Sequence, residues 1–410
     1  MRFISNIRQK GLLMGISAML VMSACNKDLE TFDTTPTPAP TGLSLAEAIS
    51  PANTDDSLYY HVVVRAGLLP TFSNRTAQFT MFVPTNQAIR ILINAASGGL
   101  VPVNAPDPVF VGFIQTSLPV ATANGIVSYN TCPQVLRSGS IPSTFPNFQY
   151  PSILNPAPSV SALLRLTTFP STANGAWLNN VPLAAVNQDV ANGVIHKTAF
   201  VVTPPQRYLW DRINTDPDLT YLRAAILRAD SGATSSTSLQ GFLQNIGANF
   251  TVFAPTNAAF QTTITGAIFQ ALVSQGVDPS IALPTAQALA STPDVFTNPL
   301  VIPYLPAQSV RGIVVYHVLG TRAFTNNIPT ADTNVPTLLN SAVPVHPGLT
   351  IKANFGVPFV SSATVKGLAN ATAANIIINS SPLLPDPVGT SDQHYLNGTL
   401  HKIDQVLMPQ

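Results

Sequence analysis

The run from Phe250 to Phe260, FTVFAPTNAAF, decides the fold, because a close copy, FTMFVPTNQAI, stands at Phe79 to Ile89. A second pair of copies lies more than a hundred residues further along in each half: NGVIHK at Asn192 to Lys197 and NGTLHK at Asn397 to Lys402. Two motifs that recur in the same order in two halves of a chain indicate two copies of one domain.

Each motif predicts a local structure. Residues Phe250 to Phe253 alternate bulky and β-prone side chains, which is typical of a strand. Pro255 cannot donate to a ladder and ends that strand, and Thr256 or Asn257 then caps a helix. The Asn397-Gly398 pair is a turn signal that leads into a closing strand. The apolar positions of that strand are Leu400, Ile403, Val406 and Leu407, ahead of Pro409.

The spacing of the motifs differs between the two copies. The first motif recurs after 171 residues and the second after 205, so the second copy is 34 residues longer between its motifs. This difference predicts inserted loops, at about Gln261 to Val310, rather than a regular solenoid.

Two helices are predicted outside the motifs. One runs from Leu58 to Ala66 and ends at Gly67. The other follows a cap at Asp216, with Pro217 at its first position and apolar residues at helical spacing up to Ala229. Both are expected to face a core.

The two motifs resemble the signature motifs of the fasciclin domain. The family's first motif, TVFAPTN, is reproduced at Thr251 to Asn257, and its second, NGVIH, at Asn192 to His196. A Tyr-His pair that the family carries between them is found at Tyr316-His317, whereas the first copy has Tyr129-Asn130.

The resemblance covers about residues 42–410 and implies an α+β fold. We expect two tandem fasciclin-type domains, each a β-sandwich or wedge flanked by helices: domain 1 at 42–204 and domain 2, with the longer insertions, at 205–410. The residues expected to build the structural motifs are Thr85, Asn86, Asn192, Gly193, His196, Thr256, Asn257, Asn397, Gly398 and His401.

The resemblance also implies candidate binding residues, because the family's Tyr-His region and the approach to its second motif are implicated in adhesion. The candidates are Tyr316, His317, Asp189 and Val190. The alternative for the Tyr-His pair is that Val315 and His317 merely alternate in a strand. The second-motif histidines are expected to be partly buried, with ring nitrogens bonded to backbone, and direct ligand contact is the alternative.

Residues 1–24 resemble a lipoprotein signal peptide. A basic start precedes a short apolar run, and Met22-Ser23-Ala24-Cys25 resembles a lipobox, so Cys25 is predicted to be lipid-modified. A plain secretory signal is the alternative. Asn26 to Glu30 look like the export tag of Bacteroidetes surface lipoproteins, and the Pro/Thr-rich end of 25–41 predicts an extended tether. We therefore expect an outer-membrane lipoprotein at the cell surface, or one that faces the periplasm.

Composition limits the partners. The net charge of +1 and the lack of a basic stripe argue against nucleic acid. With Cys25 lipidated, Cys132 has no disulfide partner and is expected to be a small buried apolar residue. No HExxH, Gly-x-Ser-x-Gly or P-loop pattern occurs, so no metal, cofactor or catalytic residue is predicted.

Three functions remain open at this stage. The first is non-enzymatic adhesion or binding of an extracellular protein or polysaccharide. The second is an accessory role in an outer-membrane nutrient-uptake complex for polysaccharide, with the domain 2 insertions docking on a transporter or binding a ligand. The third is an enzyme whose site lies within those insertions.

Overall fold

The computed structural model describes residues 41–234, 237–356, 359–379 and 388–410. These residues lie in one compact unit with two separate main sheets. The signal peptide, Cys25 and the tether lie outside the described residues. Helices and strands both contribute to each half of the chain, so the fold is α+β, as the sequence predicts.

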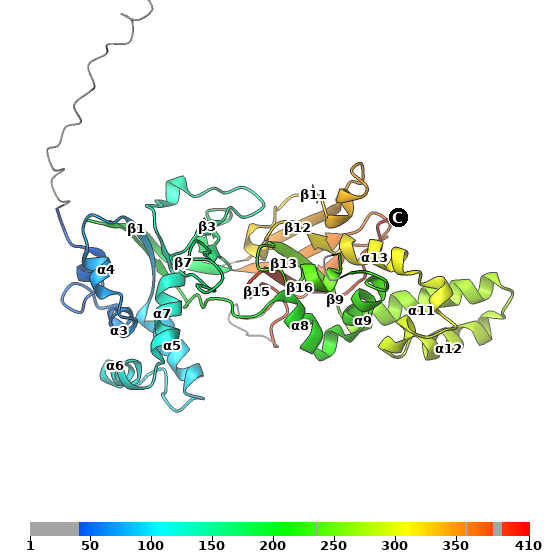
Figure 1. Cartoon of the computed structure of the whole chain (residues 1–410), viewed down its shortest axis with the longest axis horizontal. Coiled ribbons are helices and arrows are strands. Elements are labelled where there is room, and N and C mark those ends of the chain that lie inside the picture. The colour runs from blue at the N-terminus through cyan, green and yellow to red at the C-terminus, as the bar shows by residue number, and fades with distance from the viewer. Residues whose placement is uncertain (1–40, 235–236, 357–358, 380–387) are drawn as a thin grey trace, which may run out of the picture. The chain divides into compact units, whose positions relative to one another are not determined.

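Domain 1 packs helices against a six-stranded sheet of order β2-β1-β8-β7-β6-β5 (Figure 1). The helices are α2 (Leu45–Ala48), α3 (Leu58–Arg65), α4 (Leu69–Ser73), α5 (Asn86–Ala96), α6 (Asp107–Thr116) and α7 (Val120–Tyr129). The strands are β1 (Phe79–Pro84), β2 (Thr131–Cys132), β5 (Pro170–Ser171), β6 (Trp177–Leu178), β7 (Val181–Val190) and β8 (Gly193–Thr198), and β3 (Tyr150–Pro151) pairs separately with β4 (Thr167–Thr168).

Domain 2 repeats this plan with longer outer strands, in the order β10-β9-β16-β14-β13-β12-β11, and β15 also pairs with β16. Its α-helices are α8 (Leu209–Thr215), α9 (Thr220–Ala229), α10 (Leu239–Phe242), α11 (Asn257–Ser274), α12 (Pro279–Leu289) and α13 (Ala307–Tyr316). Its strands are β9 (Phe250–Pro255), β10 (Val318–Leu319), β11 (Thr333–Val335), β12 (Leu349–Phe355), β13 (Val360–Lys366), β14 (Ala374–Ile376), β15 (Gln393–Tyr395) and β16 (Gly398–Ile403).

The two motifs of each copy lie side by side in the sheet. β1 pairs in parallel with β8, and β9 pairs in parallel with β16, in the same register. Both motif strands of each copy are therefore central, flanked on both sides by other strands. This placement explains why their alternating faces are almost completely buried.

The predicted strand, turn and helix of the first motif are confirmed in both copies. The strands end at Pro84 and Pro255, and α5 and α11 begin directly after the capping threonines. The second-motif strand is shorter than predicted, because β16 ends at Ile403. Val406 and Leu407 remain buried beyond it.

Both predicted helices outside the motifs are present. α3 ends within one residue of the predicted end and is followed by Gly67, whose φ of 73° suits a residue without a Cβ. Asp216 caps a short 3₁₀ turn, Pro217–Leu219, and α9 continues from it. Apolar faces of both helices lie in the two main cores.

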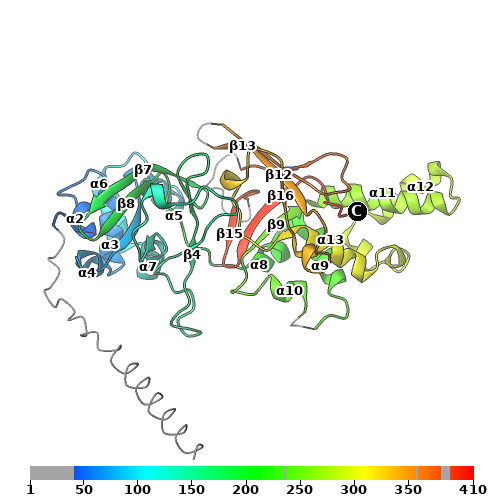
Figure 2. The same cartoon turned by 90° about the horizontal axis from the view of Figure 1, so that it is seen from above.

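Helices form much of the insertion in domain 2, so the prediction of inserted loops is wrong in this respect. α11 is 18 residues long, whereas its counterpart α5 has 11, and α12 packs back along it. Figures 1 and 2 show that this hairpin extends beyond the sheet and helices of domain 2. α11 has no clear amphipathic period, because it carries apolar residues on most of its faces.

No single helix within the described ranges is long and apolar enough to cross a membrane. α6 and α7 reach the required length and composition only as a pair bent by 108°. Both contribute buried side chains to the core of domain 1.

Candidate functional site

The threonine of the first motif caps a helix in each copy. The side chains of Thr85 and Thr256 each accept a hydrogen bond from the backbone N–H three residues on, at 3.3 Å. The two caps have extended backbones with nearly identical angles. The motif threonines therefore satisfy helix ends that would otherwise lack partners.

The asparagine that follows fastens a second helix. Asn86 Oδ1 accepts from the backbone N–H of Leu58 at 2.8 Å, and Asn257 Oδ1 accepts from that of Tyr221 at 3.2 Å. Each amide nitrogen donates to a backbone carbonyl in the loop that precedes the fastened helix. Both motif asparagines therefore hold α3 or α9 against the sheet.

The second-motif asparagine serves another helix in the same way. Asn192 Oδ1 accepts from the N–H of Leu45, and Asn397 Oδ1 accepts from that of Leu209. The glycine that follows is required by close packing, because a Cβ on Gly193 would collide with the carbonyl oxygen of Phe79. A Cβ on Gly398 would also be too close to backbone.

The ring nitrogens of the second-motif histidines bond to backbone as predicted, but the side chains are fully buried rather than partly buried. Nε2 of His196 lies 2.7 Å from the carbonyl oxygen of Leu136, and Nε2 of His401 lies 3.1 Å from that of Ala323. Each Nδ1 accepts a backbone N–H, so the proton is on Nε2 in both rings. Burial lowers the pKa of His196, which favours this neutral form.

The lysine that closes the second motif forms an ion pair in each copy. Lys197 Nζ lies 2.7 Å from Asp56, and Lys402 Nζ lies 2.9 Å from Asp216 and 3.1 Å from Asp218. The side chain of Lys402 is 7% exposed and that of Lys197 is 28% exposed. The repeated motifs thus act within the scaffold.

Tyr316 and His317 end a helix, so the alternative in which Val315 and His317 alternate in a strand is wrong. The β-branched run before them suggests a strand, but Val310 and Val314 lie one helical turn apart on the core side of α13. Both side chains of the pair are buried.

The polar atoms of this pair are occupied by the fold. The Tyr316 hydroxyl donates to Gly348 and accepts from Leu368. Nδ1 of His317 bonds to Ile313, and Nε2 accepts the N–H of Leu407. In this conformation neither side chain is available to a ligand at the surface.

Asp189 and Val190 lie at the end of β7, beside the second motif. Asp189 is exposed and forms an ion pair with Arg137 at 2.8 Å, with side chains 63% and 58% exposed. Val190 is half-buried against the core of domain 1. Asp189 is the one candidate of the four that presents a charged group to solvent.

The same strand positions in domain 2 form a junction with domain 1. His394 pairs across from Thr399 as Asp189 pairs across from Val194, so His394 is the counterpart of Asp189. Phe324 is likewise the counterpart of Arg137. His394 and Phe324 pack against aromatic rings of domain 1, with centroids 5.8–6.5 Å apart, and their own centroids lie 5.5 Å from each other.

A buried arginine completes the junction. Arg322 Nη1 donates to Nε2 of His394 at 2.6 Å, and its guanidinium carbon lies 4.9 Å from the ring centre of Phe169. Burial first, and then the charge of Arg322, hold the pKa of His394 well below its ordinary value. Burial also lowers the pKa of Arg322 to about 10. His394 is therefore a neutral acceptor in the junction.

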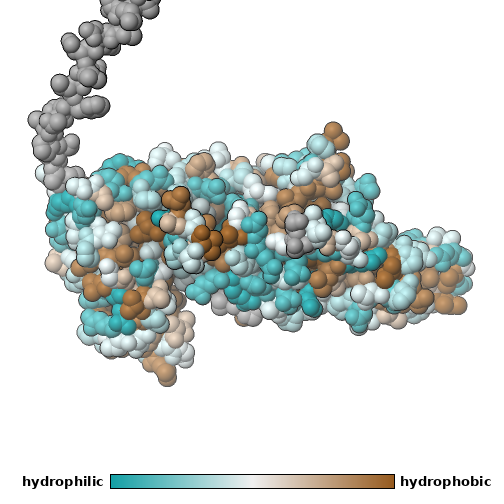
Figure 3. All heavy atoms as spheres, in the orientation of Figure 1, coloured by the Kyte–Doolittle hydropathy of each residue, from teal (hydrophilic) through white to brown (hydrophobic). Residues whose placement is uncertain are grey.

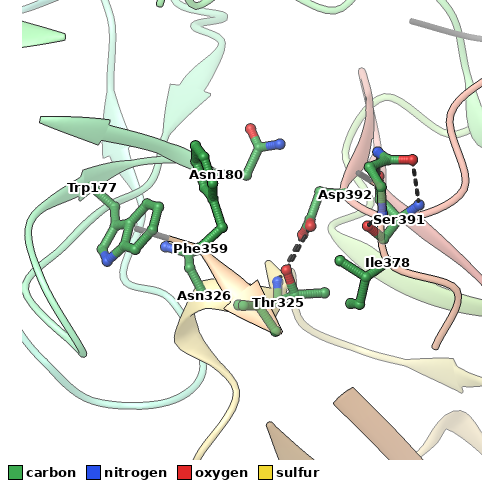
Figure 4. Close-up of a pocket in the computed structure, with 10 residues that line it drawn as sticks. Trp177, Asn180, Thr325, Asn326, Phe359, Ile378, Ser391 and Asp392 are labelled. Atoms are coloured by element: carbon green, nitrogen blue, oxygen red, sulfur yellow. Dashed lines mark hydrogen bonds between the residues drawn. The ribbon is translucent and has the colours of Figure 1, made fainter. Parts of the chain in front are cut away.

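A small pocket lies at the same junction (Figure 4). Trp177 and Phe359 lie on one side, and Asp392, Ser391 and Ile378 lie on the other. Thr325, between them, donates to both oxygens of Asp392, from its N–H at 2.7 Å and its hydroxyl at 2.6 Å. The remaining lining residues are Asn180, Asn326, Val360 and Asn379.

The pocket residues could not be predicted from the sequence, because they come from distant segments of both domains. A comparison of the two copies at the motif spacing would have pointed to one of them. Asp392 stands 205 residues after Asn187, which is the spacing of the second motif.

Cys132 is fully buried, as predicted for a small apolar residue. Burial raises the pKa of its thiol to about 11, so the reactive thiolate is disfavoured. Across the described residues, no group of three or more His, Cys, Asp and Glu side chains is arranged to hold a metal ion.

Comparison with solved structures finds 19 similar chains. A FAS1 domain pair from the insect cell adhesion molecule Fasciclin I has a TM-score of 0.33 and 13% sequence identity, over 85% of this chain and 95% of that chain. No protein-family model matches the sequence. No curated protein matches it either.

Proposed function

We propose that this chain is a non-enzymatic binding protein that uses two fasciclin-type domains as a scaffold for adhesion to an extracellular protein or polysaccharide. One observation carries the proposal. The side chains that recur in both motif copies are engaged by the fold itself, through caps, backbone hydrogen bonds and ion pairs. We therefore expect a binding partner to contact the segments in which the two domains differ.

The helical hairpin α11–α12 is the largest of those parts and has the surface of a contact element. Asp278 and Asp294 are the only charged residues between Ser231 and Val310. On α12, Ile281 is 61% exposed and Leu283 is 45% exposed. Figure 3 shows apolar atoms among the polar ones over this hairpin. Exposed apolar groups on a charge-poor surface favour contact with another macromolecule.

The lipid anchor is part of the proposal. Cys25 would carry the lipid after removal of residues 1–24, and 25–41 would hold domain 1 away from the outer membrane. Protease treatment of intact cells, with a periplasmic protein as the control, tests surface display. Loss of the protein only after the outer membrane is broken would place it in the periplasm instead.

Retention of cells, glycans or envelope proteins by the immobilised full chain tests the binding role. The double substitution Ile281→Asp and Leu283→Asp should reduce retention severalfold. Thr285→Asp, which adds a charge at an exposed position of the same helix, is the matched control. Equal retention by all three proteins would remove the hairpin from the proposal, and no retention above background would reject adhesion.

A second candidate is an accessory role in a nutrient-uptake complex for polysaccharide, in which the hairpin docks on a transporter. The same uncharged apolar surface favours it, because stable interfaces between subunits are depleted of charge at their centres. Purification from solubilised membranes separates the candidates. A stoichiometric porin-like partner that is lost with the double aspartate variant supports docking, whereas an isolated chain opposes it. Turnover of a glycan or ester by the pure chain would overturn both.

A further inference from the structure

Asn187 of domain 1 and Asp392 of domain 2 share an unusual backbone conformation. Asn187 has a φ of 61° and Asp392 has a φ of 54°, in the left-handed region. The N–H of each donates to Nδ1 of the motif histidine, at 3.3 Å and 3.1 Å. Each side chain also bonds to a hydroxyl residue on the neighbouring loop, Ser138 in domain 1 and Thr325 in domain 2. The two positions are therefore structural counterparts.

The counterparts differ in charge, and the difference is not required by the fold. Domain 1 builds the same turn with the neutral amide of Asn187. Next to the hydroxyl residue, domain 1 has Gly139 where domain 2 has Asn326. Asp392 and Asn326 are both lining residues of the junction pocket. The carboxylate and the second amide are thus additions specific to domain 2.

The carboxylate of Asp392 has no cationic partner within the described residues. Its side chain is 9% exposed, and none of the residues that line the pocket is Lys or Arg. Nδ1 of His401 lies 3.9 Å away, but it accepts the backbone N–H of Asp392 and therefore offers no proton to the carboxylate. A charge removed from water in this way is costly unless a counter-ion or a metal compensates it.

Asn326 adds a buried amide without hydrogen-bond partners to the same pocket. The residue is 2% exposed, and neither its amide oxygen nor its amide nitrogen has a hydrogen-bond partner in the described part of the chain. Buried polar atoms of this kind usually have a ligand, ion or water as their partner. Asn180 brings a further amide to the pocket from domain 1.

The size of the pocket limits what it can hold. Its inner space of about 30 Å³ is enough to hold a water molecule. A monatomic ion therefore fits in this space. The donors are carboxylate and amide oxygens, which are ligands of hard cations.

We propose that the junction pocket is a Ca²⁺ site, in which Asp392 supplies the charge and Asn326 supplies a neutral oxygen, with Asn180 contributing from the other domain. Each oxygen of Asp392 accepts one hydrogen bond from Thr325 and keeps a lone pair for the ion. A site with a single carboxylate should bind weakly, with a Kd of roughly 10⁻⁴–10⁻³ M, as in extracellular modules. The ion would connect the two domains, and the inference stands apart from the adhesion proposal.

Terbium luminescence offers a direct test, because Tb³⁺ shares the oxygen preference of Ca²⁺ and is excited through a nearby tryptophan. Trp177 lines the pocket. The purified full chain should give Tb³⁺ emission that Ca²⁺ displaces, and Trp177→Phe should abolish emission while calorimetry still detects Ca²⁺. Asp392→Asn should lose binding at least tenfold. Asn326→Gly should weaken it severalfold.

The chain itself provides controls for folding and for charge. Both pocket substitutions copy residues that domain 1 tolerates, so far-ultraviolet circular dichroism should be unchanged. Asn187→Asp in the Asp392→Asn background restores the net charge and should not restore emission. Equal Ca²⁺ binding by wild type and Asp392→Asn would overturn the proposal, as would emission restored by Asn187→Asp. The same holds if neither emission nor a Ca²⁺-dependent rise in Tm is found for wild type.

Discussion

Replacement of His317 by asparagine should remove a pH-dependent part of the stability of domain 2. Burial lowers the pKa of His317 to about 4, from an ordinary value of 6.5. The folded protein therefore excludes a proton that the unfolded chain takes up below about pH 6.5. The stability contributed by the neutral ring is complete above that pH and is lost as pH falls towards about 4.

The magnitude follows from the two pKa values. Each pH unit below 6.5 should cost about 1.4 kcal/mol, up to a total of about 3 kcal/mol near pH 4. Asn130 occupies the counterpart position in domain 1 and makes the same bond to the helix carbonyl four residues back. His317→Asn keeps that bond but leaves the N–H of Leu407 without its acceptor, so it should cost about 1–3 kcal/mol at pH 7.5.

Urea unfolding between pH 7.5 and 4 measures both quantities. Trp210 lies in the core of domain 2, so its fluorescence in a Trp177→Phe background reports this domain. The stability advantage of wild type over His317→Asn should shrink by about 3 kcal/mol across the range. Other titrating groups are common to both proteins and cancel. A difference that stays constant with pH would refute the assigned pKa shift.

Three further experiments test two motif interactions and the buried thiol of Cys132. Lys402→Met should cost about 2 kcal/mol. Arg212 still pairs with Asp216 after this change, but the two carboxylates then share one cation near a buried site. Lys197→Met should cost at most about 1 kcal/mol at its partly exposed site, and equal losses in urea unfolding would contradict this ranking. Gly193→Ala should cost roughly 3 kcal/mol or more, because the added Cβ collides with backbone. Gly112→Ala is the control and should be tolerated, because its Cβ meets no atom within 4 Å. Similar Tm values for the two variants would show that the strand can shift. Alkylation of Cys132, followed by mass spectrometry, should be negligible in the folded chain and complete in urea; rapid labelling of the native form would show that the thiol is accessible.

The sequence was informative where local chemistry determines structure. The strand, proline and capping threonine of the first motif act over neighbouring residues, so their structure could be predicted without tertiary contacts. The buried histidine of the second motif could also be placed, because a histidine within an apolar strand needs backbone partners.

Tertiary contacts determine the features that were missed. The run before Tyr316 has strand-forming residues, yet packing of its valines against the core favours a helix. The pocket and the burial of Arg322 depend on contacts across the two domains, between segments more than a hundred residues apart. No local period or short motif encodes such contacts.

The junction also makes the arrangement of domains directional. Domain 2 offers aromatic and neutral groups at Phe324 and His394, while domain 1 offers the ion pair of Arg137 and Asp189 at the same positions. If a further domain were joined ahead of domain 1 and packed in the same way, the charged side chains of Arg137 and Asp189 would have to be desolvated. Concatenated copies of this chain would therefore form a string of separate pairs rather than a continuous stacked rod.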